Sequence, residues 1–257
     1  MDLGDRHTFQ LFLEVYGTLP RAGPGSTAET LRALSLVPNK GNIQRLLDLG
    51  CGPGAQTLVL AGALPEADVL ALDLAPQMVA EARRRCDEAG LGDRVEVAEG
   101  DLTAPQVPAA SQDLIWCEGA IYFAGIEAAL STWRPLLSAG GVVAFTEPIW
   151  IGRSPPEELA AWWNEEYPAI SDEDGVRAAV SSAGFETIGF FGLAAASWWD
   201  EYYEPMETRV KKLLHEHPQD PVAVEIAAVA TNEIEMFRRF SDFYTYGFFI
   251  TRPDGEA

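Results

Sequence analysis

Three glycines and two aspartates are the first residues of this chain whose types and spacing could do chemistry. Gly50, Gly52 and Gly54 end a short apolar run, and Asp48 precedes them. Glycines let a backbone turn tightly and approach a ligand closely. Asp73 follows 23 residues after Gly50, where a carboxylate can accept both hydroxyls of an adenosine ribose. The spacing predicts a site for an adenosine-containing cofactor.

The glycines alone do not choose the cofactor. Gly50-x-Gly52-x-x-Ala55 also satisfies the dinucleotide fingerprint. Asp48 is more discriminating, because it stands where a dinucleotide places its pyrophosphate and a carboxylate there would oppose binding. S-Adenosylmethionine brings an ammonium and a sulfonium to this place, and both suit an acid. The alternative role for Asp48 and Asp73 is turn-capping at strand ends.

The elements that must position these residues alternate regularly from residue 43 onward. Such alternation predicts right-handed βαβ units and a parallel sheet that is buried on both faces. The predicted strands are 43–49, 69–74, 95–98, 114–117, 142–146, 185–193 and 244–251. The predicted helices are 5–17, 54–63, 76–89, 126–137, 156–166, 172–183, 207–215 and 222–240, with a further short one after Ser26.

The domain organisation follows from the absence of a clear linker. We interpret residues 1–257 as a single domain, with an N-terminal helical cover at 1–40. A helical insertion at 194–243 separates the last two strands. Ser26 is expected to cap the second helix, and Glu29 completes the pattern of a capping box.

Successive motifs resemble those of a known family. Asp48-Leu49-Gly50-Cys51-Gly52-Pro53-Gly54, then Asp73, then Gly100-Asp101-Leu102 are similar to the motifs of the class I S-adenosylmethionine-dependent methyltransferases, and 113–122 resembles a small-molecule branch. The resemblance covers nearly the whole chain. It implies an α/β, Rossmann-like fold with a seven-stranded, mostly parallel sheet in the order 3-2-1-4-5-7-6. Strand 7 would be antiparallel, and helices would cover both faces.

The resemblance also implies roles for single residues. Asp73 would hold the ribose, Asp101 would accept the exocyclic amine of adenine, and Leu102 would lie beside the adenine. Residues before the first strand would cover the cofactor and the acceptor. The set assigned to S-adenosyl-L-methionine is Tyr16, Gly25, Ser26, Asp48, Gly50, Cys51, Gly52, Asp73, Leu74, Gly100, Asp101, Leu102 and Glu118.

Candidate acids and bases follow the predicted strands. Methyl transfer is an in-line displacement from a neutral leaving group, so it needs alignment more than acid catalysis. A general base helps when the acceptor is a hydroxyl or a protonated amine. We take Glu118 and Tyr122 as the catalytic candidates, and Glu147 and His7 as less favoured candidate bases. The alternatives are a cofactor or helix-capping contact for Glu118, and packing or solvation for His7.

Two further features bear on the acceptor. The helix 5–17, tethered through Gly17 and Gly23-Pro24-Gly25, predicts a mobile cover, with a static helix as the alternative. Aromatic residues gather later in the chain, where they either pack the insertion, which we favour, or bind an apolar or onium acceptor. They are Trp150, Trp162, Trp163, Tyr167, Trp198, Trp199, Tyr202 and Tyr203.

Composition narrows the partners. The net charge of −21 disfavours nucleic acid and anionic membranes, so we expect a small-molecule acceptor. The three cysteines have no metal-ligand spacing and indicate no metal site, and they suit a reducing cytoplasm. The start of the chain has no basic segment typical of a signal peptide, and no apolar run reaches about 18 residues.

Two other functions stay open at this stage. An NAD(P)-dependent oxidoreductase is disfavoured by Asp48 and Asp101, and by the lack of a Tyr-x-x-x-Lys pair, since the only lysines are Lys40, Lys211 and Lys212. A non-catalytic S-adenosylmethionine-binding module is the other alternative, because methyl transfer needs no essential acid or base. The sequence leaves the acceptor and the oligomeric state open.

Overall fold

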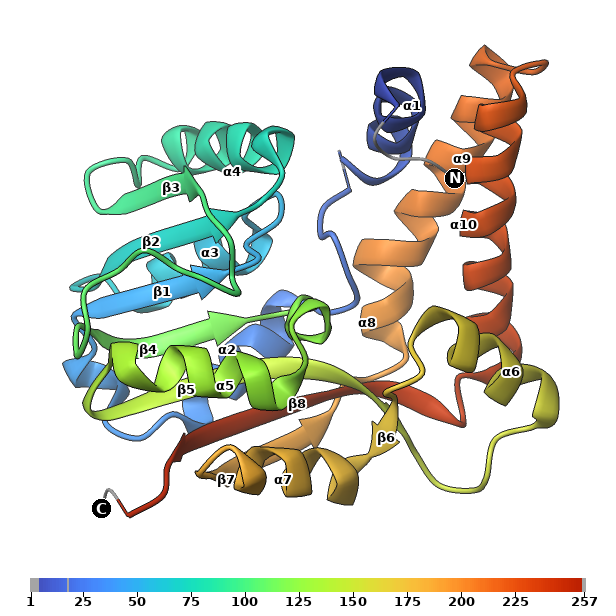
Figure 1. Ribbon diagram of the computed structural model, residues 1–257. Coiled ribbons are helices and arrows are strands. Elements are labelled where there is room, and N and C mark those ends of the chain that lie inside the picture. The colour runs from blue at the N-terminus through green and yellow to red at the C-terminus, as the bar shows by residue number, and fades with distance from the viewer. Residues whose placement is uncertain (1–4, 18, 256–257) are drawn as a thin grey trace.

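The computed structural model describes residues 5–17 and 19–255. Within them, eight strands form one sheet in the order β3-β2-β1-β4-β5-β8-β7, with β6 beside β5 (Figure 1). The seven predicted strands take the predicted order, and the last one, β8, is antiparallel to both neighbours. The strands are β1 (Arg45–Leu49), β2 (Asp68–Asp73), β3 (Val95–Glu99), β4 (Gln112–Cys117), β5 (Leu137–Trp150), β6 (Ser171–Asp172), β7 (Phe185–Gly192) and β8 (Tyr244–Pro253).

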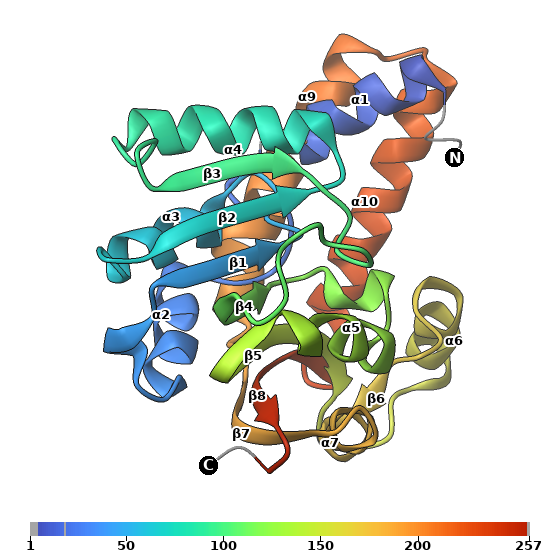
Figure 2. The same cartoon turned by 60° about the vertical axis from the view of Figure 1, so that its left-hand side comes forward.

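Helices cover both faces of the sheet (Figures 1 and 2). Helices α2, α3 and α4 pack on one face, and α5 and α7 pack on the other. None of the helices in the described residues has the length and apolar character that crossing a membrane requires. The helices are α1 (Arg6–Tyr16), α2 (Thr27–Leu36), α3 (Ala55–Ala63), α4 (Pro76–Glu88), α5 (Ile126–Trp133), α6 (Glu157–Glu166), α7 (Glu173–Ser182), α8 (Ala196–Trp198), α9 (Glu204–Glu216) and α10 (Pro221–Phe240).

Strand β4 shows why the sequences of the central strands are continuous apolar runs. Leu114 and Trp116 belong to the hydrophobic cluster under α2, α3 and α4, while Ile115 and Cys117 belong to the cluster under α5 and α7. Side chains alternate between the two faces of a strand, and here both faces are buried. A strand without polar alternation is therefore what a two-sided core requires.

The predicted insertion continues from β7 through α8, a π-helical turn at Trp199–Tyr203, α9 and α10 before β8. In Figure 1 these helices and α1 stand beyond the ends to which β1–β4 point. Buried side chains of the insertion, such as Met206 and Phe237, share one hydrophobic cluster with the α2–α4 face of the sheet. The insertion therefore packs onto the sheet's own core.

Two features of the sheet differ from the prediction. Strand β5 runs from Leu137 to Trp150, longer than the predicted 142–146, and the pair Gly140-Gly141 lies inside it. Gly140 has a φ of 76°, next to a register shift where β5 pairs with β4, so these glycines form an irregularity of the strand. The two-residue strand β6 has too little sequence to produce a periodic signal.

Candidate active site

The glycine-rich turn between β1 and α3 lines one side of a cavity. Gly50, Gly52 and Gly54 all have left-handed backbone, with φ of 69°, 52° and 85°. A Cβ atom on Gly50 would lie 2.4 Å from the Cβ atom of Ala120, closer than two carbon atoms can approach. The glycines therefore provide both the turn and the close approach of the loop after β4.

Asp73, at the carboxyl end of β2, is tied to this turn. Its Oδ2 accepts the Gly52 amide at 2.8 Å, and its Oδ1 accepts the Ala75 amide at 2.9 Å. Each carboxylate oxygen has a second lone pair, and the side chain is partly exposed in the cavity. Asp73 thus caps the turn, as the alternative interpretation held, and still offers two acceptor sites to a ligand.

Asp48 lies beneath the turn and does not line the cavity, contrary to our expectation of a direct ligand contact. Its side chain is 0% exposed. It accepts hydrogen bonds from Thr57 Oγ1 at 2.5 Å and Gln56 Nε2 at 3.3 Å. Burial raises the pKa of the Asp48 carboxyl to about 7. Its role in this geometry is to fix the start of α3 against β1.

The residues assigned to the adenine also line the cavity, in the loop after β3. Gly100, Asp101 and Leu102 all contribute to the lining. Asp101 Oδ1 accepts the amide and the hydroxyl of Thr103, at 2.8 and 2.7 Å, and its carboxylate is exposed. Leu74 also lines the cavity with 73% of its surface exposed, so it offers an apolar face at the rim.

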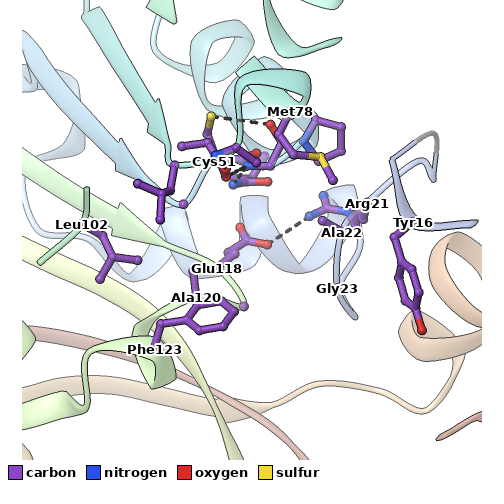
Figure 3. Close-up of a pocket in the computed structure, with 18 of the residues that line it drawn as sticks. Tyr16, Arg21, Ala22, Gly23, Cys51, Met78, Leu102, Glu118, Ala120 and Phe123 are labelled. Atoms are coloured by element: carbon purple, nitrogen blue, oxygen red, sulfur yellow. Dashed lines mark hydrogen bonds and ion pairs between the residues drawn. The ribbon is translucent and has the colours of Figure 1, made fainter. Parts of the chain in front are cut away.

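Glu118 faces the cavity in a buried ion pair that the sequence did not reveal. Arg21 Nη1 donates to Glu118 Oε2 at 3.0 Å, and the two side chains are 4% and 6% exposed (Figure 3). Glu118 Oε1 accepts Thr30 Oγ1 and Trp116 Nε1, each at 2.8 Å. The same Arg21 donates through Nε to Glu201 Oε2 at 2.9 Å. One guanidinium therefore joins the N-terminal loop, strand β4 and the insertion.

The cavity built by these residues has a volume of about 840 Å³ and lies at the carboxyl ends of β1–β4. Open α/β sheets bind their ligands at this edge. Helix α1 closes one side with Phe9, Phe12 and Tyr16, of which the last two rings stack at 4.3 Å. We call it the large cavity. Of the expected site residues, those that line it are Tyr16, Gly50, Cys51, Gly52, Asp73, Leu74, Gly100, Asp101, Leu102, Glu118 and Tyr122.

Two expected residues of the N-terminal loop lie outside the lining. Ser26 is the N-cap of α2, where its hydroxyl accepts the Glu29 amide at 3.3 Å. Gly25 donates its amide to the Ser197 carbonyl at 3.1 Å. The Gly25 amide therefore ties this loop to the insertion, and Ser26 begins α2, so both residues act on the loop's shape. Thr18, which follows the expected hinge at Gly17, lies outside the described residues.

The two weaker base candidates occupy different places. His7 is exposed and pairs with Asp220 at 2.7 Å, far along the chain at the start of α10. Glu147 is 2% exposed, and its Oε1 accepts the Tyr167 hydroxyl at 2.6 Å. Burial raises the pKa of Glu147 to about 7. Neither side chain lines the large cavity.

A second, smaller cavity of about 290 Å³ adjoins the first. We call it the aromatic chamber, because half of the residues that line it are Trp or Tyr, chiefly from α6, the π-helical turn and β8. The two cavities share a neck, to which Tyr122, Gly119 and Tyr202 contribute. The remaining shared residues are Ala22, Gly23 and Pro24. Burial raises the pKa of Tyr122 above its ordinary range, so its hydroxyl keeps its proton at the neck.

Comparisons with known proteins agree with this geometry. A family model described as a methyltransferase domain matches residues 46–141, from β1 into β5. Trans-aconitate 2-methyltransferase of Streptomyces avermitilis is 30% identical over 168 residues, which cover 62% of this chain and 60% of that protein. The uncharacterized protein YjhP of Escherichia coli is 28% identical over 72% of this chain and 74% of its own length.

A solved structure has the same fold. It is an S-adenosylmethionine-dependent methyltransferase from Geobacter sulfurreducens, in complex with S-adenosyl-L-homocysteine. The TM-score is 0.78 at 22% identity, and the match covers 97% of this chain and 98% of that one. The likeness shows that this chain shares the fold of that methyltransferase. The matched domain, the strand order and the glycine turn are similar to those of the class I S-adenosylmethionine-dependent methyltransferases.

Proposed function

We propose that this protein transfers the methyl group of S-adenosylmethionine to a small-molecule acceptor. The observation that carries the proposal is a pair of joined cavities. The larger one has the glycine turn and the acceptor atoms of Asp73, and the neck leads from it into a chamber of about 290 Å³. A cofactor in the first and an acceptor in the second would meet at the neck.

The residues present fit this cofactor. Asp73 keeps one free lone pair on each oxygen for the two ribose hydroxyls, since each oxygen accepts one backbone amide. Asp101 Oδ1 carries both contacts with Thr103, which leaves Oδ2 for the adenine amine. Leu74 and Leu102 give the adenine apolar contacts. A bound S-adenosylmethionine supplies an electrophilic methyl carbon on a positively charged sulfur.

The chain's own residues mainly align the reaction. Alignment of two reactants accounts for up to about 7–11 kcal/mol of a barrier. Glu118 is held by three donors, so we propose that it positions the N-terminal loop through Arg21 rather than taking a proton. Tyr122, at the neck, is the expected catalytic residue that can touch the acceptor, as a hydrogen-bond donor.

Calorimetry with a matched pair of variants tests the cofactor assignment. Wild-type protein should bind S-adenosylhomocysteine with a dissociation constant of about 1 μM, near −8 kcal/mol, and bind NAD far more weakly. Asp73→Asn should weaken S-adenosylhomocysteine binding by roughly tenfold or more, because hydrogen bonds to a charged group contribute about 1.5–3 kcal/mol each. Asp68→Asn, at the exposed start of the same strand, is the control and should bind normally.

Turnover is then sought by product mass spectrometry with cofactor that carries an isotopically labelled methyl group. Transfer to any acceptor in a metabolite panel supports the proposal. Tighter binding of NAD than of S-adenosylhomocysteine would overturn it in favour of an oxidoreductase. Tight binding without turnover across the panel would favour a non-catalytic binding module.

A further inference from the structure

We propose that the acceptor is an amine, and that the aromatic chamber recognises its positive charge through ring faces and the carboxylate of Glu233. This inference rests on the proposed function, because it names the substrate class of the same site. It assigns a role to α6, α10 and β8, which the cofactor site does not use.

Half of the residues that line the chamber are aromatic. Trp163 and Tyr244 meet at 5.1 Å between ring centroids, and Tyr122 and Tyr167 meet at 5.9 Å beside the neck. Ring faces attract a cation by about 0.5–2 kcal/mol each, more so where water is excluded. The other aromatic residues of the lining are Trp162, Trp198, Tyr202, Tyr203 and Tyr246.

A carboxylate stands among these rings. Glu233, on α10, lines the chamber and keeps part of its surface accessible there. Its Oε1 accepts the hydroxyls of Tyr202 at 3.3 Å and Tyr203 at 3.2 Å. Oε2 has no hydrogen bond to any described residue, so it is free to accept an N–H donor.

Among the described residues, no basic side chain forms an ion pair with this carboxylate. The titratable groups that face it are Glu166 on α6, Tyr16 on α1, Tyr122 at the neck, and the tyrosines of the π-helical turn and β8. Among the described residues that line the chamber, none is basic. Burial raises the pKa of Glu233 to about 7, as expected for a carboxyl without a counter-charge. A bound cation would supply that charge.

Two further polar groups in the walls have no partner. The Tyr244 hydroxyl and the Trp163 indole N–H are buried and make no hydrogen bond within the described residues. Both residues line the chamber, and both are less than a tenth exposed. Buried polar groups are normally paired, so these two favour a ligand with hydrogen-bonding atoms.

The charge movement of the reaction matches this environment. The bound ammonium first loses its proton to water. The lone pair of the resulting free amine then forms the new N–C bond, while the S–C electron pair returns to sulfur. The cofactor sulfur becomes neutral, and the acceptor nitrogen becomes a cation that releases its proton afterwards. Positive charge therefore develops on the chamber side of the neck, where a carboxylate and aromatic faces stabilise it.

An anionic acceptor finds no such match. Among the described residues that line the two cavities, Arg21 is the only basic one. Glu118 and Glu201 already occupy its guanidinium at 3.0 and 2.9 Å. A tricarboxylate would therefore have to enter a cavity that holds carboxylates of its own, without a free cation to pair with.

A binding experiment with two isosteres tests the charge preference. Choline and its neutral analogue 3,3-dimethylbutan-1-ol have the same shape, and they are titrated at pH 8 into protein saturated with S-adenosylhomocysteine. We expect choline to bind roughly tenfold tighter or more, which corresponds to about 1.4 kcal/mol. Equal affinities, or tighter binding of the anion tricarballylate than of choline, would overturn the proposal.

Variants assign the preference to Glu233. Glu233→Gln should reduce the ratio of the two affinities to roughly threefold or less, because the charge is lost and the shape is kept. Glu165→Gln, on the exposed side of α6 and outside the chamber lining, should keep the full ratio. An unchanged ratio in Glu233→Gln would show that Glu233 has no part in recognition.

A pH series keeps the test decisive if Glu233→Gln does not fold. The charge of choline is permanent, so a change in its affinity between pH 6 and 8 reports the protein's carboxyls. Choline should bind more tightly as the pH rises through about 7, where Glu233 ionises. Glu147 titrates in the same range, so Glu147→Gln is measured alongside and should keep the slope. A flat series would overturn the proposal.

The same titrations separate this inference from the proposed function. If S-adenosylhomocysteine does not bind, the proposed function fails before choline is added. If it binds and choline shows no preference, only the amine inference fails. Turnover assays that compare primary and secondary amines with tricarboxylates then test whether the preference seen in binding holds for methyl transfer.

Discussion

The large cavity and the aromatic chamber share a neck but are assembled in different ways. Most polar groups of the large cavity come from the turns after β1–β4, within residues 50–123. The chamber combines α6, the π-helical turn, α10 and β8, which are spread over residues 148–246, with the neck loops. Short motifs at the ends of strands therefore suit a common cofactor, whereas residues from separate helices can vary with the acceptor.

The buried carboxylates of the two regions also differ in their partners. In the large cavity, Glu118 is paired with Arg21 at 3.0 Å. In the chamber, Glu233 is held by two tyrosine hydroxyls and has no cation partner among the described residues. A carboxylate that is paired with a cation holds elements of the fold together. A carboxylate without a counter-charge is available to bind a ligand. Variants at Arg21, Gly50 and Glu233 test this division.

Arg21→Met should cause the largest effect, because Arg21 joins the two regions. Removing one partner of a buried ion pair costs about 3–5 kcal/mol, since the other charge is left buried without a partner. We expect the free energy of unfolding to fall by about this amount in urea titrations. Adding Glu118→Gln to the same chain should recover part of the loss.

Arg84→Met is the matched control. Arg84 pairs with Glu81 and Glu88 on the surface of α4, where ion pairs contribute about 0–1 kcal/mol. If Arg21→Met is no more destabilising than Arg84→Met, the buried pair does not hold the regions together.

Gly50→Ala should weaken S-adenosylhomocysteine binding by about 100-fold, or about 2.7 kcal/mol. The new Cβ atom would lie 2.4 Å from that of Ala120, in a backbone with φ of 69°, so the turn must shift. Gly62→Ala in α3 is the control, because nothing lies within 4 Å of its added Cβ atom. Calorimetry at equal protein stability distinguishes a displaced turn from global unfolding, and equal affinities for both variants would contradict the role of Gly50.

The pH dependence of stability sharpens the contrast between the carboxylates. The folded pKa of Glu233, about 7, lies above its ordinary value of 4.5, so the folded state binds the proton more tightly. This contribution is fully present below pH 4.5 and is lost as the pH rises to about 7.

Wild-type protein should therefore lose more stability between pH 5 and 8 than Glu233→Gln does. A difference of about 1 kcal/mol corresponds to roughly 2–4 °C in Tm for a domain of this size. Differential scanning calorimetry of both proteins at each pH measures it. Parallel curves would mean that Glu233 is ordinary in its acidity and that the chamber does not isolate it.

The smallest effect is expected for the N-terminal cover. The loop after α1 is fastened, because Arg85 donates to the carbonyls of Leu19 and Pro20 at 3.0 and 2.9 Å. Any movement should therefore be confined to α1, with its hinge near Gly17. S-Adenosylhomocysteine should slow proteolysis near residue 17 a few-fold, in line with a lid that closes on binding. Equal cleavage with and without ligand would mark α1 as a static wall.

Much of the cofactor side was predictable from the sequence, because its signals are local. A strand, a glycine turn and an acid at the end of the next strand are joined by backbone geometry, so spacing alone brings Gly50 and Asp73 to one edge of the sheet. The order of the seven predicted strands followed from the family's motifs and was confirmed. The position of Asp48 beneath the turn was not predictable, since both faces of β1 are buried and the apolar pattern does not distinguish them.

Only the tertiary structure determined the acceptor side. Arg21 meets Glu118 across 97 positions and Glu201 across 180, and no local pattern links such residues. The aromatic residues had been interpreted as packing, and many are buried, yet they also enclose a chamber with Glu233. Periodicity reports which side of an element is apolar, but whether two apolar surfaces close or leave a space depends on how the elements pack. Local patterns in the amino-acid sequence therefore predicted the fold and the lining of the large cavity, while packing decided the shape and charge of the aromatic chamber.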